Sequence, residues 1–353
     1  MNKIEQKFWR YGTPLSIVIA LVLAGVLFVA VGQDPIKVYA SIATGSIGTG
    51  YGISETILMA VPLLLISLGL CIAYKGRFWN IGSEGQYVMG AIAVTPLALY
   101  FHGLPSYVSI PILLVVSAVV GGAYGAIAGV LKARLGVSEI ITTLMMNFIA
   151  IDFLSYLTWG PLMGSLERAS VGATTKTGQP MSDPMPLTTQ LARILPQAEY
   201  RVNVGIILAL ALVAITYAFV SRTSLGYQIR VMGSNADAAR AAGMGTRKIT
   251  ITVAFLSGAF AGLAGAAVLL GAAHRLSEGF ATGLGYTGIM VALLGKTNPI
   301  GALLAALFVA GLSTGSNFMY RTIGLPVFVV DIVIGFILLV MLAIEAVSRV
   351  RLR

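Results

Sequence analysis

The heptad NIGSEGQ places an amide, a carboxylate and a second amide close together in a strongly apolar chain. The three side chains belong to Asn80, Glu84 and Gln86. Polar groups at membrane depth are tolerated where they line a cavity or are buried against protein. The heptad therefore has two interpretations. Either its side chains edge a substrate path and briefly hydrogen-bond a substrate, or Glu84 pairs with Lys75 or Arg77 and fixes a helix end.

Two further polar residues, Asn147 and Asp152, interrupt the apolar stretch at residues 139–160. A charged side chain at the centre of a membrane helix costs at least ~2.5 kcal/mol on insertion scales, so such residues should face protein or water. We predict that both belong to the same substrate path as the heptad. For Asp152, a pore-facing role and a structural role are equally open.

The segment at residues 222–248 combines five basic residues with an alanine-rich stretch that carries helix-capping signals. An Asx residue suits an N-cap, and a glycine suits the position after the last helical turn. Asp237 and Arg240 are three residues apart, so they can pair on one helical face. The pattern predicts a short cytoplasmic helix that docks onto a partner protein. Its residues are Asn235, Ala236, Asp237, Ala238, Ala239, Arg240, Ala241, Ala242 and Gly243.

Several chemistries lack the residues that they need. The only Gly-Lys-Thr, at residues 295–297, has Met290 where the first glycine of a phosphate loop must stand. No H-E-x-x-H motif is present, and the one G-x-S-x-G match, at residues 311–315, lies inside an apolar predicted span. One cysteine and two histidines are too few for a disulfide framework or a typical metal centre. We expect no enzyme activity, no metal site and no cofactor bound by this chain.

The composition points to a membrane protein. Of 353 residues, 57% are apolar and 10% are charged, against about 25% charged residues in soluble domains. The net charge of +10 does not indicate nucleic-acid binding, because the basic residues are scattered between apolar runs. A membrane helix needs about 20 apolar residues. The chain then contains ten predicted spans, at residues 13–31, 54–74, 82–101, 108–131, 139–160, 202–221, 249–271, 281–295, 300–319 and 326–346.

The distribution of Lys and Arg predicts the orientation of these spans. With the N-terminus inside, 16 of the 23 basic residues lie on inner segments and seven on outer ones, as the positive-inside rule requires. Both termini are then cytoplasmic. An alternative for the first span is a cleaved signal peptide, because Lys3, Lys7 and Arg10 precede its apolar stretch. The outer segment at residues 161–201 is rich in proline, and it is either a docking surface or a plain solvated loop.

A faint internal repeat relates the two halves of the chain. Gly76, Gly82 and Gly85 recur 203 residues later as three further glycines. The offset maps the third span onto the eighth, and an odd number of crossings turns the second copy upside down. Such inverted repeats are common in transporters, and short or interrupted spans, such as the eighth, often lie beside the substrate. We therefore predict an all-α polytopic membrane protein with about ten transmembrane helices in two inverted five-helix repeats, all within one domain, residues 1–353.

Glycines at every fourth position mark two helices that pack closely. Gly121, Gly125 and Gly129 lie in the fourth span, and Gly258 and Gly262 lie in the seventh. Small residues at this spacing allow helix backbones to approach each other in a membrane. We expect both spans to be buried inside the bundle.

Two motifs resemble a known family. The pattern G-x-x-I-R-x-M-G-x-N-x-x-A-A-x-x-A-G-M, at residues 226–244, is similar to the ATPase-coupling loop of ABC importer permeases of the ribose and branched-chain amino acid class. The stretch at residues 62–91, which contains the heptad, resembles the subgroup that imports nucleosides beside a basic-membrane-protein type lipoprotein. The resemblance extends over residues 51–346.

The resemblance implies a complete transport system around this chain. The expected partners are cytoplasmic ABC ATPase subunits, which use the ATP, a second and paralogous permease subunit, an extracytoplasmic substrate-binding lipoprotein and the lipid bilayer. The expected location is the bacterial cytoplasmic membrane. Two alternatives remain: a sugar permease of the ribose type, and a secondary transporter driven by an ion gradient with Asp152 and Glu84 as ion ligands.

Overall fold

The computed structural model describes residues 18–164, 180–195 and 200–350. Within these residues the regular structure is helical, and β pairing is limited to two isolated bridges. The predicted all-α class is therefore confirmed. Both chain termini and residues 165–179 and 196–199 of the predicted outer loop lie outside the described residues. The orientation of the termini and the signal-peptide alternative accordingly stay predictions.

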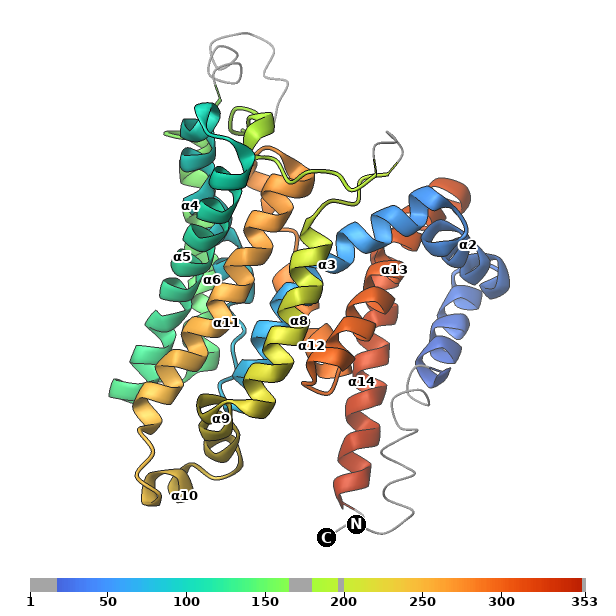
Figure 1. Ribbon diagram of the computed structural model, residues 1–353. Coiled ribbons are helices and arrows are strands. Elements are labelled where there is room, and N and C mark those ends of the chain that lie inside the picture. The colour runs from blue at the N-terminus through green and yellow to red at the C-terminus, as the bar shows by residue number, and fades with distance from the viewer. Residues whose placement is uncertain (1–17, 165–179, 196–199, 351–353) are drawn as a thin grey trace. The chain divides into compact units, whose positions relative to one another are not determined.

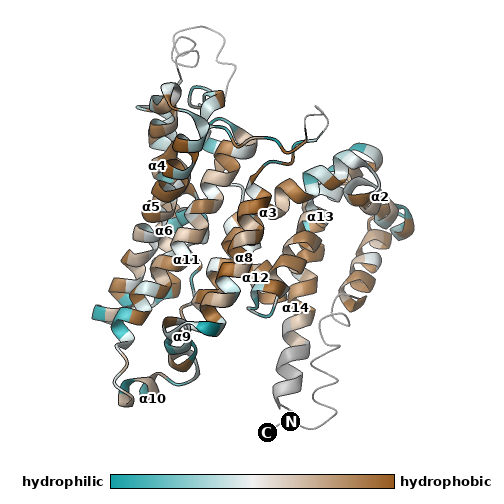
Figure 2. Ribbon diagram, viewed as in Figure 1, coloured by the Kyte–Doolittle hydropathy of each residue, from teal (hydrophilic) through white to brown (hydrophobic). Residues whose placement is uncertain are grey.

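The helices follow the predicted apolar segments closely (Figure 1). After a first helix at Val18–Ala30, they are α2 (Pro35–Ile47), α3 (Gly50–Lys75), α4 (Ser83–Tyr100), α5 (Ser106–Leu135), α6 (Glu139–Trp159), α8 (Gly205–Arg222), α9 (Ser224–Ser234), α10 (Ala236–Ala241), α11 (Thr246–Val268), α12 (Leu284–Leu294), α13 (Pro299–Ile323) and α14 (Phe328–Val350). Figure 2 shows hydrophobic ribbon along α5, α8 and α11 and hydrophilic ribbon toward their ends, the pattern expected of membrane helices.

Six of these helices are long and apolar enough to cross a membrane: α3, α5, α6, α8, α11 and α13. The helix Val18–Ala30 and α2 would together make a seventh span, although they are bent by 117° at the break between them. The remaining predicted spans contain helices that are shorter or less apolar, among them α4 and α12. A multi-pass membrane protein is thus supported, whereas the count of ten crossings stays a prediction.

The chain divides into two compact units. The first holds residues 1–60, 198–200 and 307–353, and the second holds residues 61–197 and 201–306. We describe each unit by itself, and the expectation of one permease domain stays a prediction.

In the first unit, α2 packs against the later part of α13. Asp34 caps α2 by accepting a hydrogen bond from the backbone N–H of Ile36. A Cβ at Gly45 would overlap the ring of Phe318, so that glycine allows the two helices to touch. The segment between the first two predicted spans, residues 32–53, thus contains the helix α2.

The second unit is built on the pairing of α5 with α11. A Cβ at Gly258 would overlap the backbone of Gly121, and one at Gly262 would overlap the backbone of Ser117. The predicted use of these glycine faces for close helix packing is confirmed, and the structure shows that the two faces pack on each other. In α11, 72% of the apolar window is buried, but in α5 only 28% is buried. The expectation that both helices are buried is therefore wrong for α5, because its glycine stripe packs on one side only.

Residues 180–195, part of the predicted outer segment, pack against one end of the second unit. Leu191 N–H donates to the carbonyl of Leu270, Met185 N–H to that of His274, and Ser182 N–H to that of Leu276. Ser182 and Met185 are buried. Residues 180–195 are therefore packed onto the end of α11 and are no plain solvated loop.

At the same end, burial lowers the pKa of His274, with smaller contributions from the nearby guanidinium groups of Arg201 and Arg193. Both causes disfavour the charged form of the imidazole.

The contact between α5 and α11 can be tested by one glycine substitution. Gly258→Ala should lower the melting temperature of the purified protein, because overpacking typically costs about 1–3 kcal/mol. Gly335→Ala in α14 is the matched control, since no atom lies within 4 Å of a Cβ there. It should leave the melting temperature unchanged or raise it slightly, because alanine is the better helix former. Equal melting temperatures for the two variants would contradict the close contact.

Candidate functional site

The connector between α3 and α4, residues 76–82, is non-helical chain between two apolar helices. Arg77 adopts φ 51°, which ends α3. Phe78 then turns inward and is 1% exposed. The backbone N–H groups of Gly76, Arg77 and Phe78 still donate to carbonyls in the last turn of α3. Those of Trp79, Ile81 and Gly82 need side-chain partners, which are Glu139, Thr143 and, from the heptad, Asn80.

Asn80 is the centre of the connector's hydrogen bonds and is fully buried. Its Nδ2 donates to Oε1 of Gln86 at 2.8 Å and to Oγ of Ser257 in α11 at 2.9 Å. Its Oδ1 accepts from the backbone N–H of Gly82 at 2.9 Å and from Nε2 of Gln86 at 3.2 Å. The two amides therefore form a reciprocal pair that ties the connector to the first turn of α4 and to α11.

Asn147 extends this network from α6. Its Oδ1 accepts from the backbone N–H of Gly85 at 2.8 Å, and its Nδ2 donates to the carbonyl of Ile81 at 2.9 Å. The same Nδ2 donates to the hydroxyl of Tyr286 in α12 at 3.0 Å. The structure thus brings Asn80, Gln86 and Asn147 together, and α4 begins against the middle of α6.

Glu84 joins the start of α4 to the start of α12. Its Oε1 accepts from the backbone N–H of Gly283 at 2.8 Å, and its Oε2 accepts from that of Gly285 at 2.6 Å. Unpaired N–H groups and the helix dipole make a helix N-terminus a favourable place for a carboxylate. The alternative that Glu84 pairs with Lys75 or Arg77 is therefore wrong, and the carboxylate instead binds backbone N–H groups at the start of α12.

The beginning of α12 is the counterpart of the beginning of α4. A π-helix at Leu269–Ala273 follows α11 and ends before His274 at φ 55°. A connector with one 3-10 turn, Glu278–Phe280, then leads to α12, which starts after Gly283 at φ 83°. The ring of Phe280 in this second connector stacks on Tyr87 of α4 at 4.9 Å. Two helices thus start beside each other inside the second unit, and each follows a non-helical connector.

Asp152 lies apart from these four residues. It is exposed on α6, as are Phe148, Ile149 and Phe153. The buried side of α6 instead carries Asn147, which is fully buried. The predicted set therefore separates into a buried cluster of four side chains and one exposed carboxylate. Contact of any of the five with a substrate stays a prediction.

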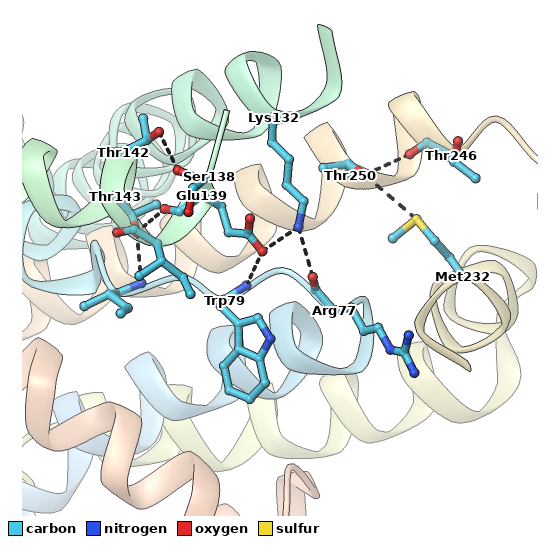
Figure 3. Close-up of polar contacts among 12 residues, drawn as sticks. Arg77, Trp79, Lys132, Ser138, Glu139, Thr142, Thr143, Met232, Thr246 and Thr250 are labelled. Atoms are coloured by element: carbon cyan, nitrogen blue, oxygen red, sulfur yellow. Dashed lines mark hydrogen bonds and ion pairs between the residues drawn. The ribbon is translucent and has the colours of Figure 1, made fainter. Parts of the chain in front are cut away.

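An ion pair between α5 and α6 holds the connector from its other side (Figure 3). Lys132 and Glu139 pair across the turn that Gly136 makes at φ 70°. Lys132 Nζ also donates to the carbonyl of Arg77 at 3.1 Å, and the backbone N–H of Trp79 donates to Glu139 at 3.4 Å. Sequence analysis missed this pair, although a Lys and a Glu on either side of a short glycine-containing turn were its visible signal.

The segment at residues 222–248 folds as two helices, α9 and α10, at the same end as that ion pair (Figure 1). Asn235 caps α10 by accepting from the backbone N–H groups of Asp237 and Ala238 at 2.9 and 3.1 Å. Gly243 adopts φ 77° just after the helix. The predicted cap, stop and Asp237–Arg240 pair are all confirmed.

The two faces of α10 differ. Ala239 is fully buried in an apolar cluster with Ile229 and Met232 of α9 and Phe78 of the connector. The other members of the predicted docking helix are exposed: Asn235, Ala236, Asp237, Ala238, Arg240, Ala241, Ala242 and Gly243. Docking by this helix stays a prediction, and Ala239 faces the chain's own core.

The described residues contain no group of three or more His, Cys, Asp or Glu side chains that could hold a metal ion. The buried cluster of Asn80, Glu84, Gln86 and Asn147 consists of three amides and one carboxylate, and their hydrogen bonds position the backbone at the starts of α4 and α12.

The role of Glu84 can be tested with Glu84→Gln. An amide keeps the shape but turns one acceptor into a donor, which would face an N–H of α12. We expect a lower melting temperature, because a buried group left unpaired costs about 1–3 kcal/mol. Glu278→Gln is the control, since Glu278 is an exposed carboxylate that accepts from Ser155 and Trp159. If Glu84→Gln melts like the wild type but transports poorly, the carboxylate acts on the substrate path.

Comparison with known proteins agrees with this architecture. The family described as branched-chain amino acid transport system / permease component matches residues 52–342. A guanosine ABC transporter permease protein of Bacillus subtilis is 35% identical over 92% of this chain and 90% of its own length. For a glucose ABC transporter permease protein of Haloferax volcanii the values are 34%, 97% and 89%. For a nucleoside ABC transporter permease protein of Lactococcus lactis they are 31%, 92% and 88%.

No solved structure matches the chain. Because the family covers most of the sequence and the helices fit a multi-pass membrane protein, the chain belongs to the permease components of branched-chain amino acid type transport systems.

Proposed function

We propose that this chain is the permease subunit of an ABC importer for nucleosides. Two of the relatives are named for guanosine and nucleoside transport, and each is aligned over 92% of this chain. The observation that carries the proposal is α10, a short helix with a side-chain cap and small exposed residues beyond the long helices. A groove on an ATPase subunit could approach such a helix closely.

Sugars are the second candidate substrates. The relative named for glucose is as similar to this chain as the one named for guanosine, at 34% against 35% identity. Nucleosides remain the first choice because two separate relatives carry that name, and because the heptad resembles the nucleoside subgroup.

An ion-driven secondary transporter is disfavoured by the geometry of its proposed ligands. Glu84 is 1% exposed and accepts two backbone N–H groups, whereas Asp152 is exposed on α6. The two carboxylates do not join in one site, although a common ion ligand set would require it.

The partners follow from the same proposal. ATP is bound and hydrolysed by separate cytoplasmic subunits, and an extracytoplasmic lipoprotein delivers the substrate to the outer segment. A second, paralogous permease completes the path. In support, a second guanosine permease of Bacillus subtilis is also related to this chain, at 26% identity over 72% of this chain and 78% of its own length. We place the complex in the bacterial cytoplasmic membrane with both termini inside.

Two inverted five-helix repeats, ten spans in all, explain why helical structure is interrupted at two corresponding places. In the first half, α3 ends shortly before Arg77, which has positive φ, a non-helical connector follows, and the shorter α4 begins. In the second half, α11 continues as a π-helix that ends before His274, which also has positive φ, and a connector with one 3-10 turn leads to α12. The two short helices meet through Glu84. Short, interrupted helices whose N-termini meet near the midplane are a common feature of transporters with inverted repeats.

Asp152 has the exposure that a path-lining residue needs. The exposed apolar side chains around it suit lipid or protein, but a carboxylate facing lipid would be costly. We propose that this face of α6 borders the path at the second permease subunit. Asn80, Glu84, Gln86 and Asn147 then shape the path from behind by positioning α4 and α12.

Docking by α10 is tested by Ala238→Glu. Ala238 is exposed, and a carboxylate there would have to be desolvated in the interface, next to the existing charge of Asp237. We expect at least a ~10-fold loss of ATPase subunit in the purified complex, about 1.4 kcal/mol, with an unchanged melting temperature. Ala273→Glu, at the end of the π-helix Leu269–Ala273, is the matched control. Undiminished ATPase binding by Ala238→Glu would contradict the proposal.

Substrate class is tested by uptake in cells that express the four expected components. Labelled guanosine should accumulate, and the accumulation should stop on ATP depletion but survive a protonophore. Excess unlabelled nucleoside should suppress uptake, whereas excess glucose or ribose should not. Suppression by sugars alone would favour the second candidate, and sensitivity to the protonophore with ATP maintained would restore the ion-driven alternative.

A further inference from the structure

The last turn of α9 rests directly on the end of α3. A Cβ at Gly233 would overlap the carbonyl oxygen of Lys75, the last residue of α3. No other amino acid than glycine fits this contact without a shift of backbone, because the atom in the way is itself a backbone atom. Gly233 is therefore a contact point between the segment at residues 222–248 and the beginning of the connector.

Side chains of α9 and α10 surround the same place. A Cβ at Gly76 would lie 3.4 Å from Ile229 of α9 and 3.2 Å from Val253 of α11. Ile229 and Phe78 are each 1% exposed and share one apolar cluster with Ala239 of α10. Close-packed protein interiors transmit a displacement, because they have few voids to absorb it.

The α9 helix runs directly into α10, where the backbone N–H of Asn235 donates to the carbonyl of Val231 at 3.0 Å and Ala239 packs on Ile229 and Met232. Thr223 caps its N-terminus by accepting from the backbone N–H of Gly226 at 3.0 Å. Met232 contacts the hydroxyl of Thr250 in α11 at 3.9 Å (Figure 3). Because α9 and α10 share the Asn235 junction and one apolar cluster, α9 would move with α10 as one body.

The connector carries any displacement to the buried polar cluster. Gly76 is four residues from Asn80, whose side chain bonds to Gln86 and to Ser257. On the other side, Lys132 and Glu139 hold the carbonyl of Arg77 and the N–H of Trp79. A push on Lys75 and Gly76 would therefore act on a chain that is fixed at its middle and that leads straight to α4.

We propose that Gly233 is a positioning residue that couples ATPase motion to the starts of α4 and α12. The contact between Gly233 and Lys75 carries the movement of α10 into the connector, and the connector moves Asn80 and α4. This inference rests on the proposed function, because it needs an ATPase subunit that moves α10. It adds the point at which that movement enters the membrane-embedded part of the chain.

The test uses the complete complex in proteoliposomes and the variant Gly233→Ala. The ATPase subunits should still co-purify, because Gly233 is not part of α10, and ATP hydrolysis should continue. Substrate transported per ATP should fall at least ~10-fold. Gly245→Ala is the matched control in the same segment, since the nearest atom to its Cβ is the flexible Lys248 side chain at 3.9 Å. Its transport per ATP should equal that of the wild type.

A second readout separates coupling from mere stability. Ser83→Cys in a Cys71→Ser background puts a thiol at the buried first residue of α4. In otherwise unchanged protein, ATP with vanadate should change its labelling rate by a small methanethiosulfonate reagent several-fold. With Gly233→Ala the rates with and without nucleotide should be equal. A purely structural defect would alter both rates together and leave their ratio intact.

The outcomes distinguish the role of Gly233 from the proposed function. Wild-type transport per ATP and an unchanged labelling ratio in Gly233→Ala would overturn the role of Gly233 and leave the importer standing. Absence of ATPase binding and of ATP-dependent uptake in the wild type would overturn the proposed function itself. If Gly233→Ala does not accumulate, the same two measurements on Gly76→Ala decide the question, because a Cβ there crowds Ile229 and Val253 by only a few tenths of an ångström.

Discussion

The structure depends on how two helices can begin inside an apolar environment. A helix start leaves backbone N–H groups without intrahelical partners, and in a membrane core each such group costs several kcal/mol if no partner is found. Here the partners are side chains from distant parts of the chain. Asn147 serves the start of α4, and Glu84, itself in the first turn of α4, serves the start of α12. Each helix start is therefore stable only when the other elements are in place.

This mutual dependence explains why local signals predicted some features and missed others. The cap and stop of α10 were predictable, because Asn235 and Gly243 act on the residues beside them. The heptad was recognised as a polar site, but its partners were not. Glu84 binds backbone groups about 200 residues away, and a backbone N–H carries no signature in the sequence. The nearest cations along the chain were the plausible alternative, and they were the wrong one.

The glycine pattern shows the same limit from the other side. Glycines spaced by four predicted a close-packing face on α5 and another on α11, since the spacing defines one face of a helix, but not that the two faces meet. The pattern could not say what covers the remaining faces, and only 28% of the apolar window of α5 is buried in this subunit. Gly233 lies in no such pattern. Its reason is a single carbonyl oxygen at the end of another helix, which only the folded chain brings to it. The number of membrane crossings was equally difficult to predict, because short helices such as α12 do not reach the length of a membrane span.

The arrangement also sets a physical requirement on transport. A cluster in which Asn80 uses both donor hydrogens and accepts two further bonds resists small deformations, because any one bond is lost only with a cost of about 1 kcal/mol or more. Motion that kept the cluster intact and moved α4 with its connector as one body would avoid that cost. The Lys132–Glu139 pair lies at the margin, where its partial exposure makes it cheaper to break than the bonds around Asn80. Movement of the connector is therefore expected to open the ion pair first, while the amide pair of Asn80 and Gln86 travels unchanged.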